Sequence, residues 1–379
     1  MKPQTFFSVF LFLGFASAGI LQNPDFESPP TNLPENSTDP FFLLNENTTL
    51  PGWTFQGTVQ YVKASKSTPL PGNGHAVQLG QDGKINQTFI ANGDNLNYIL
   101  TFTLTYGGQD CLVDAGLVVS APDSHGVFAF KQNYGKEKWQ SFAHYLGIWG
   151  EDQPINIVFE SQAVESDVNS TCWPIVDSLL IKTFGTLVQG HDNLLANGGF
   201  EDGPHFLSNS SDGILLEPAP SPIQSPLSQF SIIGTVKYID SKHFSVPQGN
   251  AAIEIVSVSS GIQTATKVIE GSTYSLTFTL GDANDGCKGD FIIGVQAGSV
   301  AQNITLHSAG TGSSKKFSLT FKADSGATPI TFLSLTSHQN RDGIFCGPVV
   351  DDVVLSDSSG SKSSEVKWIF LIFLLLAIL

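Results

Sequence analysis

Asn197-Gly198-Gly199-Phe200-Glu201 reveals the organisation of this 379-residue chain, because a variant of it, Asn23-Pro24-Asp25-Phe26-Glu27, occurs 174 residues earlier. A second phrase recurs at the same interval, as Cys172-Trp173-Pro174-Ile175-Val176-Asp177 and Cys346-Gly347-Pro348-Val349-Val350-Asp351. Matched phrases at one fixed interval indicate an internal repeat. The chain is therefore predicted to be two tandem copies of one unit, each opening on the first phrase and closing on the second.

Each copy contains short runs in which apolar and polar residues alternate, a pattern that predicts half-buried strands. The glycine inside the Trp53–Val62 run and its counterpart predicts a bulge or a hairpin bend. No segment has a sustained helical period, so the fold class predicted is all-β, with two tandem antiparallel β-sandwiches of jelly-roll type. The expected strands lie in Trp53–Val62, Pro71–Leu79, Tyr98–Leu104 and Ile155–Phe159 of the first copy, and in Phe230–Ile239, Pro247–Ile255, Tyr274–Leu280 and Ile330–Leu333 of the second.

A stretch rich in Pro, Ser and Asn follows the opening phrase of each copy, Ser28–Leu50 in the first and Asp202–Ser228 in the second. This composition is typical of surface loops. The junction between the copies is expected near 187–191 without a flexible linker. The predicted domains are therefore residues 19–188 and 189–356.

The amino terminus has the order of a secretory signal peptide. Lys2 and the apolar run Phe6–Phe15 precede Ala16-Ser17-Ala18, a small-residue cleavage site. Cleavage is predicted after Ala18, which removes residues 1–18. An uncleaved anchor is the weaker alternative, because about ten apolar residues are too few to cross a membrane.

The carboxyl terminus has the order of a lipid-anchor signal: small polar residues, a polar spacer and the apolar tail Trp368–Leu379. Twelve helical residues at about 1.5 Å each do not span a hydrocarbon core of roughly 30 Å, which disfavours a transmembrane helix. We expect residues 357–379 to direct attachment of a glycosylphosphatidylinositol anchor to the membrane. The candidate attachment residues are Asp357, Ser358 and Ser359.

The chain is acidic. Without Lys2, Lys362, Lys367 and Glu365 of the terminal segments, 15 basic and 33 acidic residues remain, a formal net charge of −18. Such a surface repels nucleic acid and anionic lipid, so no nucleic-acid partner is expected.

Four cysteines, one pair in each copy, indicate disulfides in an exported protein. Three pairings exist, and the repeat selects Cys111 with Cys172 and Cys287 with Cys346. Closing loops of about sixty residues stabilises a chain by ~4 kcal/mol each in the chain-entropy model. Metal binding by the cysteines is disfavoured because no C-x-x-C spacing occurs. Six glycosylation sequons also fit export, at Asn36, Asn47, Asn86, Asn169, Asn209 and Asn303.

No recognisable catalytic motif occurs: G-x-S-x-G, H-E-x-x-H and the phosphate-binding loop are all missing from the sequence. His75 and His144 have the apolar or aromatic neighbours of structural histidines. The segment Asp282–Gly286 departs from an EF-hand, because its glycine comes one position early and no glutamate closes the loop. No catalytic residue is therefore predicted.

The repeated phrases pair two carboxylates in each copy, Glu27 with Asp177 and Glu201 with Asp351. If the first and last strands of a sandwich lie side by side, the members of each pair meet. Carboxylate oxygens suit calcium, so one structural calcium ion in each copy is a hypothesis, with no other cofactor expected. The alternative is a carboxylate that accepts backbone hydrogen bonds at a strand end.

Exposed aromatic rings are the natural means of gripping sugars, because the apolar faces of pyranoses stack on them. Trp53 is assigned to the core instead, since it aligns with Phe230 on a predicted strand. The candidates for glycan binding are Tyr134, Trp139, Tyr145, Trp149 and Trp173.

In combination, the opening phrases, Leu50–Trp53, Gly57–Val62, Asn197–Pro204 and Cys346–Asp352 resemble those of plant cell-wall proteins that contain domain of unknown function 642. The resemblance covers the whole mature chain. It implies two galactose-binding-like β-sandwiches, an extracellular location at the cell wall, association with wall polysaccharide, and pectin methylesterases as partners. The opening phrase is also similar to that of carbohydrate-binding modules in which such a Glu and a late Asp hold structural calcium.

Three positions depart from the family pattern. Asn23-Pro24-Asp25 replaces a glycine-bearing turn, Ser228-Gln229-Phe230 replaces Pro-Gly-Trp, and Trp173 stands where the family has glycine. These departures indicate a divergent member whose ligand preference need not match that of its relatives.

The function predicted from these features is a non-enzymatic, glycosylated protein at the outer face of the plasma membrane that binds polysaccharide of the pectin or cellulose type. A protein-interaction module that modulates a wall-modifying enzyme is the first alternative, because a basic pectin methylesterase suits a charge of −18 better than polyanionic pectin does. A glycan hydrolase with an unrecognised carboxylate pair is the second.

Overall fold

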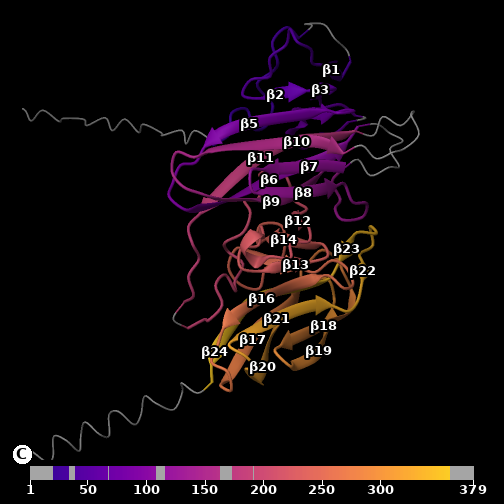
Figure 1. Ribbon diagram of the computed structural model, residues 1–379. Coiled ribbons are helices and arrows are strands. Elements are labelled where there is room, and N and C mark those ends of the chain that lie inside the picture. The colour runs from indigo at the N-terminus through magenta and orange to yellow at the C-terminus, as the bar shows by residue number, and fades with distance from the viewer. Residues whose placement is uncertain are drawn as a thin grey trace, which may run out of the picture.

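The computed structural model describes residues 20–33, 39–66, 68–107, 116–162, 173–190 and 192–358. Within these ranges the two copies form two β-sandwiches, one above the other in Figure 1, and no α-helix occurs. The prediction of an all-β protein with two tandem sandwiches is confirmed. Two short 3₁₀ turns are present, η1 (Pro71–Asn73) and η2 (Pro222–Gln224).

The strands are short and follow one another closely, as the alternating runs predict. Those of the first copy are β1 (Phe41–Leu43), β2 (Thr54–Gln56), β3 (Val59–Lys63), β4 (His75–Leu79), β5 (Lys84–Ile90), β6 (Leu96–Tyr106), β7 (Gly116–Ala121), β8 (Ser124–Ala129), β9 (Gln140–Trp149), β10 (Pro154–Gln162) and β11 (Pro174–Phe184). Those of the second are β12 (Ile214–Leu216), β13 (Ser231–Ile233), β14 (Val236–Asp240), β15 (Ala251–Glu254), β16 (Gly261–Lys267), β17 (Thr273–Asp282), β18 (Gly289–Ala297), β19 (Val300–Ser308), β20 (Ser314–Lys322), β21 (Ala327–Ser334), β22 (His338–Gln339), β23 (Phe345–Cys346) and β24 (Pro348–Asp357).

One large sheet runs through both copies in the order β1-β3-β4-β11-β6-β9-β12-β14-β15-β24-β17-β20. A five-stranded sheet completes each sandwich, β2-β5-β10-β7-β8 in the first copy and β13-β16-β21-β18-β19 in the second. The strand order repeats between the copies, so β1 corresponds to β12 and β9 corresponds to β20.

The glycine shared by Trp53–Val62 and Phe230–Ile239 lies where the chain passes from one sheet of the sandwich to the other. Gly57 has φ +68° and Gly234 has φ +62°, values that favour glycine. A Cβ atom on Gly57 would lie 2.0 Å from the carbonyl oxygen of Asp82. The predicted bend is confirmed, and the run forms two strands: β2 lies in the five-stranded sheet and β3 in the large one.

Each sandwich has its own aromatic core in the same place. Phe102 on β6 packs edge-on against Phe159 on β10, with ring centroids 5.9 Å apart. Phe278 on β17 packs in the same way against Phe332 on β21, at 5.0 Å. All four side chains are fully buried, and deletion of such a ring costs about 3–5 kcal/mol.

The joint between the copies is a shared strand. The segment Asp202–Ser228, predicted to be a surface loop, contains β12, which pairs antiparallel with β14 and parallel with β9 of the first copy. Side chains alternate along a strand, and accordingly Leu215 lies in the first core whereas Ile214 and Leu216 lie in the second. The loop prediction is wrong for this part and for β1 within Ser28–Leu50, because β12 and β1 each pair antiparallel with the next strand of the large sheet, β14 or β3, and β12 gains a second partner from the other copy.

Polar contacts reinforce the joint. The Nζ atom of Lys131 lies 3.0 Å from Oε2 of Glu217 and donates a hydrogen bond to Oγ1 of Thr235 at 2.9 Å. The backbone N–H of Phe345 donates to the carbonyl oxygen of Asn133 at 2.7 Å. These links cross from one copy to the other and fix their relative placement.

The disulfide Cys287–Cys346 joins the segment after β17 to β23, with Cα atoms 6.0 Å apart. This confirms the predicted pairing in the second copy, whereas Cys111 and Cys172 lie outside the described residues. The predicted signal peptide, the apolar tail and Ser359 also lie outside them. In the part that the structure describes, no helix is long and apolar enough to cross a membrane.

Candidate functional site

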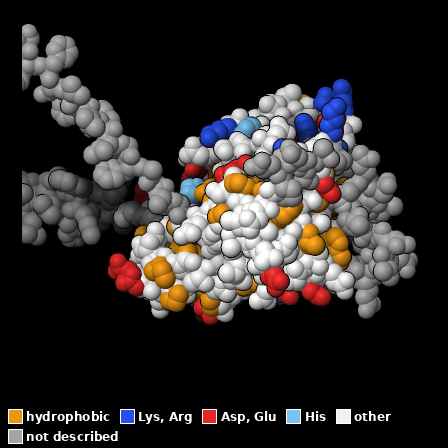
Figure 2. Space-filling view, turned by 90° about the horizontal axis from the view of Figure 1, so that it is seen from above, with side chains coloured by type: hydrophobic (Ala, Val, Ile, Leu, Met, Phe, Trp, Pro, Cys, Tyr) orange, Lys and Arg blue, Asp and Glu red, His pale blue; other side chains and the backbone are white. Residues whose placement is uncertain are grey.

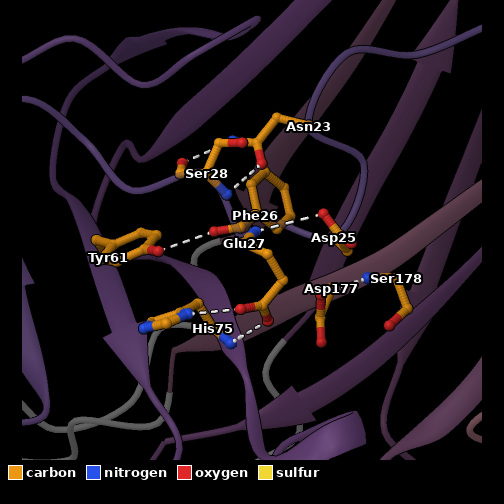
Figure 3. A network of polar contacts seen from close by, with 9 residues as sticks. All are labelled: Asn23, Asp25, Phe26, Glu27, Ser28, Tyr61, His75, Asp177 and Ser178. Carbon is orange, nitrogen blue, oxygen red and sulfur yellow. Dashed lines mark hydrogen bonds and ion pairs between the residues drawn. The ribbon is translucent and has the colours of Figure 1, made fainter.

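The opening phrase of the first copy is a compact hydrogen-bonded turn (Figure 3). Asn23 and Phe26 both have positive φ, 47° and 54°. The Asn23 side chain accepts a hydrogen bond from the backbone N–H of Ser28 at 2.8 Å and donates to its carbonyl oxygen at 3.0 Å. The Phe26 ring is fully buried, and the backbone carbonyl oxygen of Phe26 accepts a hydrogen bond from the Tyr61 hydroxyl at 2.8 Å.

The second copy repeats this geometry. Asn197 and Phe200 have φ values of 60° and 56°, and the Asn197 side chain bonds both backbone groups of Asp202. The Tyr238 hydroxyl donates to the Phe200 carbonyl oxygen at 2.8 Å. Repetition of these contacts shows that the phrase stabilises the start of each sandwich.

The glutamate that ends the phrase caps the next hairpin. Glu27 accepts a hydrogen bond from the backbone N–H of His75 at 2.7 Å, and its other oxygen lies 2.8 Å from Nδ1 of His75. Glu201 accepts from the backbone N–H groups of Asn250 and Ala251 at 2.7 and 3.3 Å. Each glutamate thus ties the opening phrase to a strand of the large sheet, β4 or β15.

The late aspartates lie at equivalent bulges in β11 and β24. Asp177 accepts a hydrogen bond from the Ser178 backbone N–H at 2.6 Å, and Asp351 accepts from the Asp352 N–H at 2.7 Å. Burial raises the pKa of Asp177 to about 8, with the Glu27 charge adding to the effect. Burial likewise raises the pKa of Asp351 to about 7.

The structure brings each predicted carboxylate pair together, with Glu27 and Asp177 side by side in Figure 3. All four oxygens of Glu201 and Asp351 accept protein N–H groups. Across the described residues, the one cluster of three acidic, His or Cys side chains with metal-binding spacing contains Asp285 and the two disulfide-bonded cysteines. The carboxylate pairs therefore serve as backbone caps in this structure, and a calcium ion held by each pair together with carbonyl oxygens stays a prediction.

The candidate sugar-stacking aromatics separate into two groups. Tyr145 and Trp149 are only 5% and 7% exposed, so neither presents an open ring face for stacking, and the assignment of Trp149 to glycan binding is corrected. Tyr145 nevertheless contributes to the lining of the cleft described below. Tyr134 is half-buried against Phe345, and Trp139 and Trp173 are half-buried as well. Trp53 lies in the core beside Phe26 and Phe159, as predicted.

A cleft of about 400 Å³ lies at the joint between the copies. One wall comes from β8 and β9 of the first copy, and the other from the proline-rich segment that follows β12 in the second. No pattern within either copy predicts this cleft, although the run of prolines from 218 to 226 is a sequence signal for a rigid segment. Its lining includes Ser124, His125, Val127, His144, Glu217, Ser221, Gln224 and Pro226.

The cleft combines hydrogen-bonding groups with apolar surface. Nε2 of His144 lies 3.2 Å from the Ser124 hydroxyl, and burial lowers the pKa of His144 to about 4, so its ring is neutral at neutral pH. Val127 is 48% exposed in the lining, and Ile223 is 65% exposed between the lining residues Ser221 and Gln224. Such a mixture suits a ligand with both hydroxyl groups and apolar faces.

The outer surface carries the described sequons. Asn47, Asn209 and Asn303 are exposed, Asn86 is half-buried on β5, and Asn36 and Asn169 lie outside the described residues. Figure 2 looks onto the end of the first copy, where hydrophobic side chains form separate small patches within a largely uncharged surface. Asp357 ends β24, and the Ser358 N–H donates to the Thr273 carbonyl oxygen at 3.0 Å.

The sequence matches the family model described as "Protein of unknown function (DUF642)" over residues 19–182 and 193–356. The chain belongs to the DUF642 family. Protein DUF642 L-GALACTONO-1,4-LACTONE-RESPONSIVE GENE 1 of Arabidopsis thaliana is 33% identical over 348 residues, which cover 89% of this chain and 90% of that protein. Protein TEEBE of the same plant is 32% identical over 348 residues, which cover 89% and 91%.

The DUF642 match contains both copies, which confirms the family resemblance and the tandem organisation. Among solved structures, the tandem CBM22 domains of Paenibacillus barcinonensis Xyn10C align with a TM-score of 0.27 and 11% identity, covering 81% of this chain and 94% of that structure.

Proposed function

We propose that this DUF642 protein is a non-catalytic, extracellular carbohydrate-binding protein of the cell wall. The observation that supports this function best is the cleft at the joint, which is open, holds hydroxyl, amide and imidazole groups, and exposes aliphatic side chains beside them. Its volume of about 400 Å³ lies within the range of ordinary ligand sites. A wall polysaccharide of the pectin or cellulose type is the proposed ligand class.

A glycan array probed with the glycosylated ectodomain tests this function. Binding to wall polysaccharides without release of sugar is the expected result. Release of reducing sugar would instead identify a hydrolase, and silence on every saccharide would refute carbohydrate binding.

Docking onto a wall-modifying enzyme is the second proposed function, because the formal charge of −18 between the terminal segments favours a basic protein partner. A basic pectin methylesterase is the proposed partner. Co-precipitation that weakens as salt is raised would support it, whereas the absence of any complex at low salt would refute it.

Membrane attachment, glycosylation and calcium are separate proposals. A phospholipase specific for glycosylphosphatidylinositol is expected to release the protein from membranes, and a glycosidase that removes N-glycans is expected to lower its mass. Structural calcium requires ligands beyond the two carboxylates of each copy. If millimolar calcium leaves the melting temperature unchanged, structural calcium is refuted and the carboxylates act only as backbone caps.

A further inference from the structure

We propose that the cleft at the joint is the saccharide site and that it takes a neutral saccharide, held jointly by the two copies; this inference rests on the proposed carbohydrate-binding function. The first copy contributes β8 and β9, and the second contributes the segment from Glu217 to Pro226. Neither copy alone forms both walls, so the binding unit is the tandem.

The wall from the second copy is rigid before any ligand arrives. Pro218, Pro220, Pro222 and Pro226 restrict its backbone. Ala219 exchanges two backbone hydrogen bonds with Ile232, at 3.1 and 2.9 Å, and further bonds hold the segment to the second sandwich. A preorganised wall loses little conformational entropy when a ligand binds, which favours affinity.

The wall from the first copy is held by packing. The His144 ring lies edge-on to Phe128 at 5.6 Å and contacts the Ser124 hydroxyl. A Cβ atom on Gly126 would lie 2.8 Å from Nδ1 of His144, so this position admits glycine where a larger residue would displace the imidazole. The shape of this wall is therefore set by β8 and β9 together.

The charge of the lining selects the class of saccharide. Two carboxylates, Asp123 and Glu217, line the cleft, and its lining contains no lysine or arginine. Lys131 pairs with Glu217 at 3.0 Å from outside the lining and offsets its charge, so the like charge lies chiefly at Asp123. A uronate chain would meet like charge there, whereas a neutral sugar finds hydrogen-bond partners in Ser221 and Gln224.

The positions of two sequons argue against the outer faces of the five-stranded sheets as saccharide sites. Asn86 lies on β5 and Asn303 on β19, one in each of these sheets. Ile85 and Ile304, beside them in sequence, are buried in the two cores, so the alternation of side chains directs both asparagines to the outer faces. A glycan at either position would cover part of such a face, while the lining of the cleft contains no sequon.

Isothermal titration calorimetry with the intact glycosylated ectodomain tests the site. The probes are a neutral cello-oligosaccharide and an oligogalacturonate of the same length. Gln224→Ala and Ser221→Ala remove hydrogen-bonding groups, and Val127→Trp fills the cleft from an exposed position. Asn156→Ala and Thr331→Ala, on the five-stranded sheets, are the matched controls.

The expected result is binding of the neutral probe, weakened about tenfold by each polar cleft variant and unchanged in the controls. Thermal melting verifies that each variant is folded. Loss of binding in the sheet variants alone would overturn the cleft as the site but leave carbohydrate binding standing. Preference for the oligogalacturonate would overturn the charge argument. No binding of any saccharide on an array would refute the proposed function itself.

Discussion

A buried ion pair in the second copy allows the most direct test of the energetics. Lys237 on β14 faces Glu254 on β15, with Nζ 3.7 Å from Oε2, and both side chains are buried. The corresponding residues of the first copy, Gln60 and Gln78, are also paired across two strands and carry no charge. The repeat therefore provides its own neutral reference for this pair.

The single substitution Glu254→Gln leaves the buried Lys237 charge without its partner, which costs about 3–5 kcal/mol of the free energy of unfolding. Lys237→Gln should cost less near neutral pH, because burial already raises the pKa of Glu254 and the carboxyl then takes up a proton. The double substitution restores the amide pair of the first copy. The free energy of unfolding of the double variant is expected to lie within about 1 kcal/mol of that of the wild type, or above it. Exchange of a buried ion pair for a neutral pair is often neutral or stabilising.

The same pair predicts a pH dependence. Burial raises the pKa of Glu254 from 4.5 to about 7, against the opposing effect of the Lys237 charge. A carboxyl with a raised pKa in the folded state contributes stability below its unfolded pKa and loses it as pH rises through the folded pKa. The shift corresponds to about 3 kcal/mol lost between pH 4.5 and 7, and the double variant should lack this loss.

Urea unfolding distinguishes the two sandwiches, because tryptophan occurs at positions 53, 139, 149 and 173 of the first copy and otherwise only at 368 in the tail. Tryptophan fluorescence therefore reports on the first sandwich and circular dichroism on both. A double variant as unstable as the single variants, or single variants as stable as the wild type, would refute the reasoning.

Three further predictions concern other parts of the fold. Leu215→Ala should lower the free energy of unfolding by about 2–5 kcal/mol and, although Leu215 lies in the second copy, should shift the tryptophan transition of the first. Ile214→Ala should shift chiefly the circular dichroism transition. The opposite pattern would contradict the shared strand. Replacing Cys287 and Cys346 together by serine should lower the free energy of unfolding by ~4 kcal/mol, and an unchanged urea midpoint would contradict this. Asp351→Asn should reduce the fall in melting temperature between pH 5 and pH 8, since the raised pKa of this carboxyl makes the wild type less stable as pH rises; an undiminished fall in calorimetry would refute that role.

The features predicted from sequence are those governed by short-range chemistry. The asparagine and phenylalanine of the opening phrase recur because the same turn requires them in both copies. Gly57 marks a bend because its backbone passes too close to Asp82 for a side chain. Cys287 and Cys346 pair as the repeat indicates.

The features missed depend on contacts between distant segments. β12 is three apolar residues in a proline-rich stretch, too short for a periodic pattern, and its partner β9 comes from the other copy. The cleft exists only because of that pairing. Tyr145 and Trp149 resemble sugar-stacking residues in sequence, but the register of β9 places both rings in cores, and only Tyr145 also lines the cleft.

The correspondence between strands has a consequence for self-association. β9 joins β12 within the chain, so their counterparts β20 and β1, at the two ends of the large sheet, have the geometry to join the next molecule head to tail and grow a fibre. β20 differs from β9 in carrying the exposed lysines Lys315, Lys316 and Lys322, and lysine on an edge strand opposes such pairing. These three charges are therefore expected to keep the large sheet from extending from one molecule to the next.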